Sequence, residues 1–373
     1  MNLLFLDSVE RGTFGGYENW ILVTARHFLE RGHQVTVVGR PGAEYLRRAS
    51  IFSDKIEVVE LPISGDFNPV TVYRLRRILK DRKIDLMTVN FNKDVRLGGL
   101  AARWYGRTKV CWRMGLDLTA PGWVHRFLSP RLVDGIIVCS HALKRQVTRL
   151  GYLSDDRVQV VHIGIDDRDF KRPDPAAVAA LRVKYHLSAD SLIAVTIGRF
   201  VDQKGHIYLV EAAPEIVSRS PQVVFLFLGD GERESMLRSR IAQLGLQDRF
   251  IFAGMLDNID LELAGADIMI HPSIEEPASF AIVEGMRAGL PTVASRVGGI
   301  PEELTDGESA LLVPPHDPQR LAEAVIRMLS DAEMRTSYSR ATQERWRQDF
   351  RLQIMMQKVE AYFAFLMSGG QVQ

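Results

Sequence analysis

The chain has 373 residues, 46% of them hydrophobic and 25% charged, and its formal net charge is +1. This length exceeds the size at which a single core usually stops growing, so the sequence predicts two domains. No apolar run reaches the roughly 18 residues that suggest a membrane span, and the apolar start is too short and uncharged for a signal peptide. We therefore expect a cytoplasmic protein. Cys111 and Cys139 lie in apolar runs, which favours buried, reduced thiols over a disulfide or a metal site.

Charge is distributed unevenly along the chain. Residues 1–170 hold 26 basic and 19 acidic side chains, whereas residues 171–373 hold 21 and 27. The basic first half suggests an anionic partner, such as the inner face of the cell membrane, although a shared solvated surface explains it equally well. A basic helix-like run at 74–83 adds to this excess, and the stretch 121–131 fits either a packed helix or a membrane-touching one. We expect no nucleic-acid partner.

Short apolar runs alternate with longer amphipathic ones from the start of the chain. In the first half the apolar runs fall at 3–7, 35–39, 86–90, 110–113 and 136–140. After a polar, proline-bearing stretch at 166–174, the series restarts at 191–198 and continues at 223–229, 250–254, 266–273, 292–295 and 310–313. Strands that alternate with helices indicate parallel sheets. The sequence thus predicts two doubly wound, Rossmann-like α/β domains, at 1–170 and 171–345, with a helical tail at 346–373 that packs back on the first.

Ligands of such sheets bind beyond the carboxyl ends of the strands, so functional residues should follow each strand, in a cleft between the halves. After the first strand, Gly15 and Gly16 precede a helix whose free amides suit an anion, although a simple glycine turn is the alternative. After the restart strand come Gly198, Arg199 and Lys204. A planar guanidinium and a point charge together suit a diphosphate.

Two carboxylates, Glu276 and Glu284, stand eight positions apart after the apolar run 266–273. A strand that delivers the first and a helix that carries the second can turn both toward one ligand, and such acceptors suit a molecule rich in hydroxyls. Alone, this spacing more often reflects a solvated helix face. Gly229 belongs to a glycine pair that lacks the third glycine of a dinucleotide fold, and the aspartates at 167 and 169 suit turn or cap duty better than metal binding. We expect no metal and no cofactor.

Taken in order, these motifs resemble those of the retaining glycosyltransferases of family GT4, which adopt the GT-B fold. The motifs are Gly15-Gly16, the stretch 163–166, Gly198-Arg199 with Lys204-Gly205, Gly229-Asp-Gly231, Pro272-Ser273, Glu276 with Glu284, and the stretch 298–302. The resemblance covers nearly the whole chain. It implies a nucleotide-sugar donor bound by the second domain and a glycan or glycolipid acceptor bound by the first.

Carried over position by position, the resemblance implies that Arg199 and Lys204 hold the diphosphate, with Gly198 and Gly229 nearby and Gly16 approaching from the first domain. Glu284 would accept hydrogen bonds from the ribose. Glu276 would face the donor sugar, together with backbone amides around Ser279 and Phe280. In this mechanism the departing diphosphate takes the acceptor's proton, and its charge is stabilised by the two cations without metal.

The chain departs from the family pattern at three places. Ser279 and Gly285 replace a usual glycine and a usual alanine, and the histidine that often follows the strand at 109–112 is absent. Arg113 and Asp117 are candidate substitutes on the acceptor side, together with Lys93, which lies in a stretch similar to that of bacterial members acting on lipopolysaccharide-type acceptors. A nucleotide-sugar epimerase, a phosphorylase of the same fold and a noncatalytic nucleotide-sugar-binding protein are the alternative functions.

Overall fold

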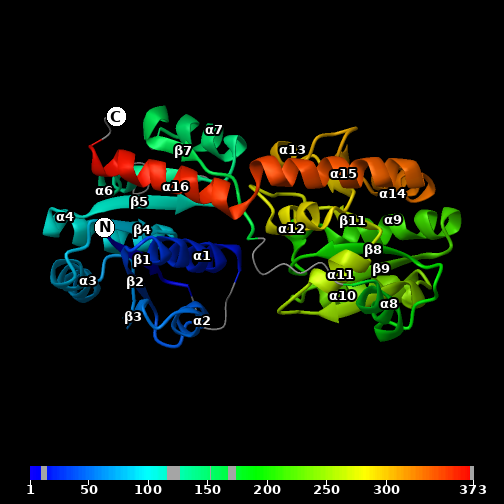
Figure 1. Ribbon diagram of the computed structural model, residues 1–373, viewed down its shortest axis with the longest axis horizontal. Helices are drawn as coiled ribbons and strands as arrows, with labels where there is room; N and C mark the ends of the chain where they lie inside the picture. The colour runs from blue at the N-terminus through cyan, green and yellow to red at the C-terminus, as the bar shows by residue number, and fades with distance from the viewer. Residues whose placement is uncertain (10–14, 116–126, 152, 167–173, 370–373) are drawn as a thin grey trace. The chain divides into compact units, whose positions relative to one another are not determined.

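The computed structural model describes residues 1–9, 15–115, 127–151, 153–166 and 174–369. Contacts within the chain divide it into two units, Met1–Val161 with Met355–Gln373, and His162–Ile354. Each unit holds one sheet flanked by helices (Figure 1), and every strand pair is parallel. The expected pair of doubly wound α/β domains is therefore confirmed. Within the described ranges, no helix is both long enough and apolar enough to cross a membrane.

The first unit is built on a seven-stranded sheet with the order β3-β2-β1-β4-β5-β6-β7. Phe5 on the central strand β1 faces Val37 on β2 and Thr88 on β4. The strands are β1 (Asn2–Asp7), β2 (Gln34–Gly39), β3 (Glu57–Glu60), β4 (Leu86–Val89), β5 (Lys109–Met114), β6 (Gly135–Val138) and β7 (Val158–Val160). The helices are α1 (Gly16–Glu30), α2 (Glu44–Phe52), α3 (Pro69–Asp81), α4 (Asn92–Tyr105), α6 (Ser129–Leu132), α7 (His141–Arg149) and α16 (Leu352–Met367).

The second unit is built on a six-stranded sheet with the order β10-β9-β8-β11-β12-β13. Its strands are near-continuous apolar runs because helices cover both faces; all six residues of β9 are buried. The strands are β8 (Leu192–Ile197), β9 (Val223–Leu228), β10 (Phe250–Gly254), β11 (Ile268–His271), β12 (Thr292–Ser295) and β13 (Ala310–Val313). The helices are α8 (Pro175–Lys184), α9 (His206–Arg219), α10 (Glu234–Gln243), α11 (Asp260–Gly265), α12 (Phe280–Ala288), α13 (Ile300–Glu303), α14 (Pro318–Ser330) and α15 (Ala332–Asp349).

The boundary between the units differs from the expected one at 170/171, which falls in 167–173, outside the described residues. The first unit ends at Val161, directly after β7. Ile163 packs into the core of the second unit, and the amide of Ile165 donates to the carbonyl of Phe350 at 3.0 Å. These contacts assign residues 162–166 to the second unit although no strand has yet begun there.

Helix α16 packs on the first unit, which provides the surface against which the aromatic residues of the helix are buried. The ring of Phe363 stacks on Phe28 of α1, with 5.3 Å between centroids. The Tyr362 hydroxyl accepts a hydrogen bond from the Ile136 amide of β6 at 3.1 Å. Figure 1 shows α16 in red on the unit that contains the amino terminus. The contiguous tail expected at 346–373 is thus divided, because residues up to 354 belong to the second unit.

Candidate active site

The residues that end or follow four strands of the second unit lie at one edge of its sheet. Gly198 follows β8, Gly229 follows β9, His271 ends β11 and Ser295 ends β12. These four strands are neighbours in the order β9-β8-β11-β12, and parallel strands end at the same edge. The structure therefore places the motifs that follow the predicted strands on a common edge.

Glu276 is the centre of a buried hydrogen-bonded group on this edge. Its Oε2 atom lies 2.5 Å from the Lys204 ammonium, 3.1 Å from His271 Nε2 and 3.1 Å from the Ser273 hydroxyl. Within the described ranges, no hydrogen bond or ion pair reaches its second oxygen, Oε1. One oxygen therefore anchors the carboxylate, and the other keeps its full capacity to accept hydrogen bonds.

The partners of Glu276 stabilise its ionised form. Burial alone would raise the pKa of this carboxyl group, but Lys204 and His271 outweigh burial and lower the pKa to about 2. Burial also lowers the pKa of His271, so the imidazole is neutral at physiological pH. The result is an ionised carboxylate beside a cation that is only 20% exposed.

Two close backbone approaches fix the loops around Glu276. Gly205 opens α9 with φ +64°, and a Cβ atom there would lie 2.1 Å from the carbonyl oxygen of Pro272. Gly298 has φ +51°, and a Cβ atom there would lie 2.1 Å from the carbonyl oxygen of Glu276, which also accepts the Gly299 amide at 2.9 Å. Only glycine fits at either position without moving the neighbouring loop. The glycines at 298 and 299 thus lie against the backbone of the loop that carries Glu276.

His271 and Glu303 were not predicted as functional residues, and Ser273 was predicted only as part of the Pro272-Ser273 motif, without a role of its own. Glu303 is 2% exposed and accepts the Ser279 amide at 2.7 Å on Oε1. The Ser279 hydroxyl caps α12 by accepting the Ile282 amide at 3.3 Å, and it lies 3.3 Å from His271 Nε2. The signal for His271 and Ser273 was polarity at the end of an apolar run, and Glu303 had no such signal.

The helix α12 carries the remaining donor-side candidates. Ser279 is its N-cap and Phe280 its first residue. The Ser279 amide is already bound by Glu303, so that amide is not free for a ligand. Gly285, on the same helix, makes room for Met269, whose Cε would lie 2.6 Å from a Cβ atom at this position.

Glu284, in the middle of α12, is partly buried. Burial raises the pKa of its carboxyl group to about 7, with Asp260 adding to this effect and Arg287 opposing it. Within the described part of the chain, no hydrogen bond or ion pair joins Glu284 to Glu276 or to any other residue. Glu276 therefore lies in the loop before α12 and Glu284 within that helix, and the two side chains do not bond to each other.

Arg199 and Lys204 differ in their surroundings although both were expected to hold a diphosphate. The Arg199 side chain is exposed, and its backbone carbonyl accepts the Val201 amide at 2.9 Å. Lys204 is joined to Glu276. Gly198 and Gly229 each donate their amide to a backbone carbonyl, to Leu228 at 3.0 Å and to Gly254 at 2.9 Å. The structure thus brings Lys204 to the Glu276 group, while no contact joins Arg199 to it within the described residues.

The first unit holds the acceptor-side candidates. Gly16 opens α1, Lys93 lies half-buried on α4, and Arg113 is buried on β5. Asp117 lies outside the described residues. The expected approach of Gly16 to a diphosphate held by the second unit stays a prediction, as do the roles of the other candidates.

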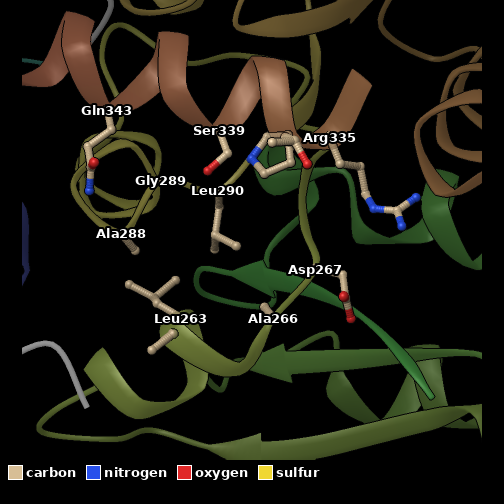
Figure 2. Close-up of a pocket in the computed structure, with 12 residues that line it drawn as sticks. Leu263, Ala266, Asp267, Ala288, Gly289, Leu290, Arg335, Ser339 and Gln343 are labelled. Carbon is tan, nitrogen blue, oxygen red and sulfur yellow. The ribbon is translucent and has the colours of Figure 1, made fainter. Parts of the chain in front are cut away.

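A separate cavity of about 310 Å³ lies at the opposite edge of the second sheet. Figure 2 shows that Arg335, Ser339 and Gln343 of α15 border it, facing Asp267 and Leu290. Asp267 directly precedes β11. The cavity thus adjoins the amino ends of strands and contains none of the residues around Glu276.

Two family models together match most of the chain. Glycosyltransferase Family 4 matches residues 14–169, and Glycosyl transferases group 1 matches residues 178–345. The lipopolysaccharide core biosynthesis glycosyltransferase LpsE of Rhizobium meliloti (strain 1021) is 29% identical over 331 residues, which cover 87% of this chain and 88% of LpsE. LpsD of the same organism, also a lipopolysaccharide core biosynthesis glycosyltransferase, is 27% identical over 354 residues, covering 91% and 92%.

Solved structures share the same fold over the full length. The structure of Anabaena Alr3699/HepE in complex with UDP has a TM-score of 0.86 at 22% identity, and the match covers 98% of this chain and 100% of that one. This likeness establishes the GT-B architecture. The two family models show that the chain is a GT4-type glycosyltransferase, with a Glycosyltransferase Family 4 domain followed by a Glycosyl transferases group 1 domain.

Proposed function

We propose that the protein transfers a hexose-type sugar from a UDP- or GDP-sugar to a hydroxyl group of a glycan or glycolipid, with retention of the anomeric configuration. The observation that carries this proposal is the Lys204–Glu276 pair, in which Lys204 and two neighbours use one carboxylate oxygen and leave the other free. The structure of HepE in complex with UDP-glucose supports a UDP-sugar as donor. LpsE and LpsD support a lipopolysaccharide-type acceptor.

In this proposal Lys204 is the principal cation for the departing diphosphate. Its ammonium bonds to Glu276, so a bound diphosphate would become a second anionic partner at the same group. Arg199 is exposed next to Gly198 and supplies a second, bidentate cation when the donor binds. With two cations stabilising the leaving group, the reaction proceeds without a metal ion.

Glu276 and α12 position the donor sugar. The free Oε1 atom of Glu276 accepts hydrogen bonds from sugar hydroxyls, while Oε2 stays fixed by Lys204, His271 and Ser273. The start of α12 at Phe280 presents the positive end of the helix to the same region. Glu284 accepts the ribose hydroxyls.

The acceptor hydroxyl attacks the anomeric carbon from the face of the leaving group. As the new C–O bond forms, the bond between the anomeric carbon and the diphosphate breaks, and the acceptor proton passes to a diphosphate oxygen. The protein therefore needs no strong base. Its contribution is charge stabilisation in a site from which water is excluded.

The test is an incubation of the purified protein with UDP- and GDP-sugars, followed by detection of released nucleoside diphosphate. We expect slow release from one donor with water as acceptor, and faster release when a glycan acceptor is added. The same donor should raise the melting temperature by mass action. Donor binding without any release of nucleoside diphosphate, with and without acceptor, would refute the catalytic proposal.

We also propose that the first unit meets an anionic membrane surface through α3. The buried face of this helix is apolar, with Val72, Leu75 and Leu79, whereas its outer face exposes Tyr73 at 53% beside the exposed Arg74. Trp104 of α4 is 56% exposed, and the Arg76 guanidinium lies 4.6 Å from its ring. Exposed aromatic rings beside cations suit the headgroup region of anionic lipids. Most of the stretch 121–131 lies outside the described residues.

Vesicle flotation tests this membrane proposal. The protein should float with phosphatidylglycerol vesicles and not with phosphatidylcholine vesicles, and binding should weaken as salt rises, because exposed charges are screened. Tyr73→Ser combined with Trp104→Ser should reduce binding to phosphatidylglycerol. Equal recovery with both lipids, or no effect of the double substitution, would contradict the assignment of this surface.

A further inference from the structure

Two arginines are fully buried within the described ranges, and they differ in their partners. Arg96 and Arg113 are each 6% exposed. Arg96 forms an ion pair with Asp66 and lies over the ring of Phe67. In the part of the chain that the structure describes, Arg113 has no ion pair and donates no hydrogen bond. Arg96 thus has an ion-pair partner, whereas no ion pair is formed by Arg113 among the residues that the structure describes.

Arg113 is held by the faces of two aromatic rings. Its guanidinium carbon lies 4.5 Å from the ring centroid of Tyr17 and 5.2 Å from that of Trp20, both on α1. Tyr17 is fixed in turn, because its hydroxyl accepts the Gly115 amide at 2.9 Å. A guanidinium held over ring faces uses none of its N–H donors in a hydrogen bond, and among the described residues no acceptor takes a hydrogen bond from Arg113. Gly115 leaves one edge open, since a Cβ atom there would lie 3.4 Å from Arg113 Nη1.

A buried cation without a partner is destabilising, so its presence requires an explanation. Burial lowers the pKa of Arg113, while Tyr17, Cys139, Glu18 and Asp7 act in the opposite direction. An arginine side chain nevertheless stays protonated in proteins, and neutralisation is not available to it as it is to lysine. The N–H donors of Arg113 are therefore free to bind an anionic oxygen group from outside the protein.

The groups next to Arg113 on the sheet edge suit hydroxyls. Asp7 ends β1, Asn90 follows β4 and Arg113 lies near the end of β5, and these strands are neighbours in the sheet. Asn90 donates to Asp7 Oδ2 at 2.8 Å, and its own Oδ1 is buried without a partner among the described residues. Burial raises the pKa of Asp7 well above its usual value, and the nearby Asp94 and Glu18 add to this effect.

We propose that Arg113 binds a carboxylate or phosphate group on the acceptor, next to the strand ends that carry Asn90 and Asp7. Binding of the anion rests on the buried, unpaired guanidinium. Only its assignment to the acceptor rests on the proposed function. The acceptor class that follows is an acidic sugar: a uronic-type acid or a sugar phosphate.

Thermal shift and titration with matched sugars test the proposal without a donor. D-glucuronate and glucose 6-phosphate carry the anion, and D-glucose at the same ionic strength is the neutral control. At least one anionic sugar should raise the melting temperature of the wild-type protein more than glucose does. A response to glucuronate alone assigns a carboxylate, and a response to glucose 6-phosphate alone assigns a phosphate. No difference between either anionic sugar and glucose would overturn the proposal.

Substitutions test which residue is responsible for the binding of the anionic sugar. Arg113→Met keeps an apolar side chain against the two rings. It should weaken the binding of the anionic sugar by roughly 10- to 100-fold, the range expected for charge-assisted hydrogen bonds. Lys204→Met removes the cation of the second unit and should leave the affinity for that sugar unchanged. Loss of the response in Lys204→Met with its retention in Arg113→Met would place the anion at the donor side and refute the proposal.

Two further measurements keep the outcome decisive. If Arg113→Met does not fold, Arg113→Lys retains the charge without the planar guanidinium and should still weaken the binding of the anionic sugar by about tenfold. Wild-type affinity for that sugar in this variant would contradict the proposal. Binding of UDP- and GDP-sugars to the same preparations is measured separately. Binding of the anionic sugar without binding of any of these donors would refute the proposed function alone, and the reverse would refute the role of Arg113 alone.

Discussion

The Ser279 amide donates to Glu303 Oε1 at 2.7 Å, while the other oxygen of that carboxyl group, Oε2, is buried without a partner within the described ranges. Burial raises the pKa of Glu303 well above its usual value, with Glu276 adding to the effect and the Ser279 amide opposing it. Glu303 thus connects the cap of α12 to α13 as a neutral acid.

This state of Glu303 predicts a pH dependence of stability. A raised pKa in the folded state means that the stabilising contribution is complete below about pH 4.5, the value of an unperturbed glutamate, and is lost as pH rises toward the folded pKa. Glu303→Gln imitates the protonated form. The unfolding free energy of the wild type should therefore decrease from pH 5 to pH 8 relative to that of Glu303→Gln, measured in urea. Parallel pH profiles would show that Glu303 is ionised in the folded protein.

Lys204 and Arg199 are expected to govern the rate of sugar transfer. Replacement of either by alanine should reduce turnover by roughly 10²-fold or more, in the range for loss of a preorganised charge-stabilising contact. Single-turnover rates at saturating donor would separate this effect from weaker binding. Near-normal rates in both variants would refute the assigned roles, and a loss confined to Lys204→Ala would restrict the diphosphate site to the residue that contacts Glu276.

Removal of Lys204 should also destabilise the second unit. Glu276 is 5% exposed, and without the ammonium it becomes a buried charge with weaker compensation. Lys204→Met should therefore lower the unfolding free energy by about 3 kcal/mol, in the range for a broken buried pair. Glu276→Gln in the same chain should restore most of the loss, because the remaining charge is gone. Equal stability of the single and double variants in urea would contradict this coupling.

Glu284 predicts a pH dependence of donor binding. Burial raises the pKa of this carboxyl group to about 7, and only the ionised form is purely an acceptor for ribose hydroxyls. Donor affinity should therefore increase with pH between 6 and 8, by at most about tenfold per pH unit for one titrating group. Calorimetric titration with UDP-glucose should show a flat profile for Glu284→Gln. A wild-type profile that is equally flat would exclude ionised Glu284 from donor binding.

Gly205 and Gly245 provide a matched test of the backbone approach next to Lys204. Both have positive φ, at +64° and +68°, but a Cβ atom at Gly205 would lie 2.1 Å from the Pro272 carbonyl oxygen, whereas at Gly245 nothing lies within 4 Å. Gly245→Ala should lose about 1 kcal/mol of stability from conformation alone. Gly205→Ala should lose clearly more and should also reduce donor affinity. Equal losses in thermal unfolding would mean that the loop after β11 moves freely away from α9.

The sequence predicts the architecture well and the site only in part, for physical reasons. Parallel strands are buried on both faces, so a continuous apolar run such as Val223–Leu228 predicts a strand even before its neighbours in the sheet are known. Glu276 and Lys204 could be found because each follows such a run. The pairing of Ser279 with Glu303 joins residues 24 positions apart in sequence, and nothing local distinguishes a buried glutamate from a solvated one. Arg113 could be singled out, but only the structure shows that it is buried and forms no ion pair with any described residue.

The crossing of α16 to the first unit has a consequence for how the protein is made. Glu360 lies 3.0 Å from His27 and 2.5 Å from Arg31, and Tyr362 donates to the carbonyl of Arg157 at 2.6 Å. The first unit therefore covers this surface only after residues 355–367 have been synthesised. A fragment that stops at Val161 lacks this covering, so an isolated first domain requires residues 355–367 supplied as a peptide or joined by circular permutation.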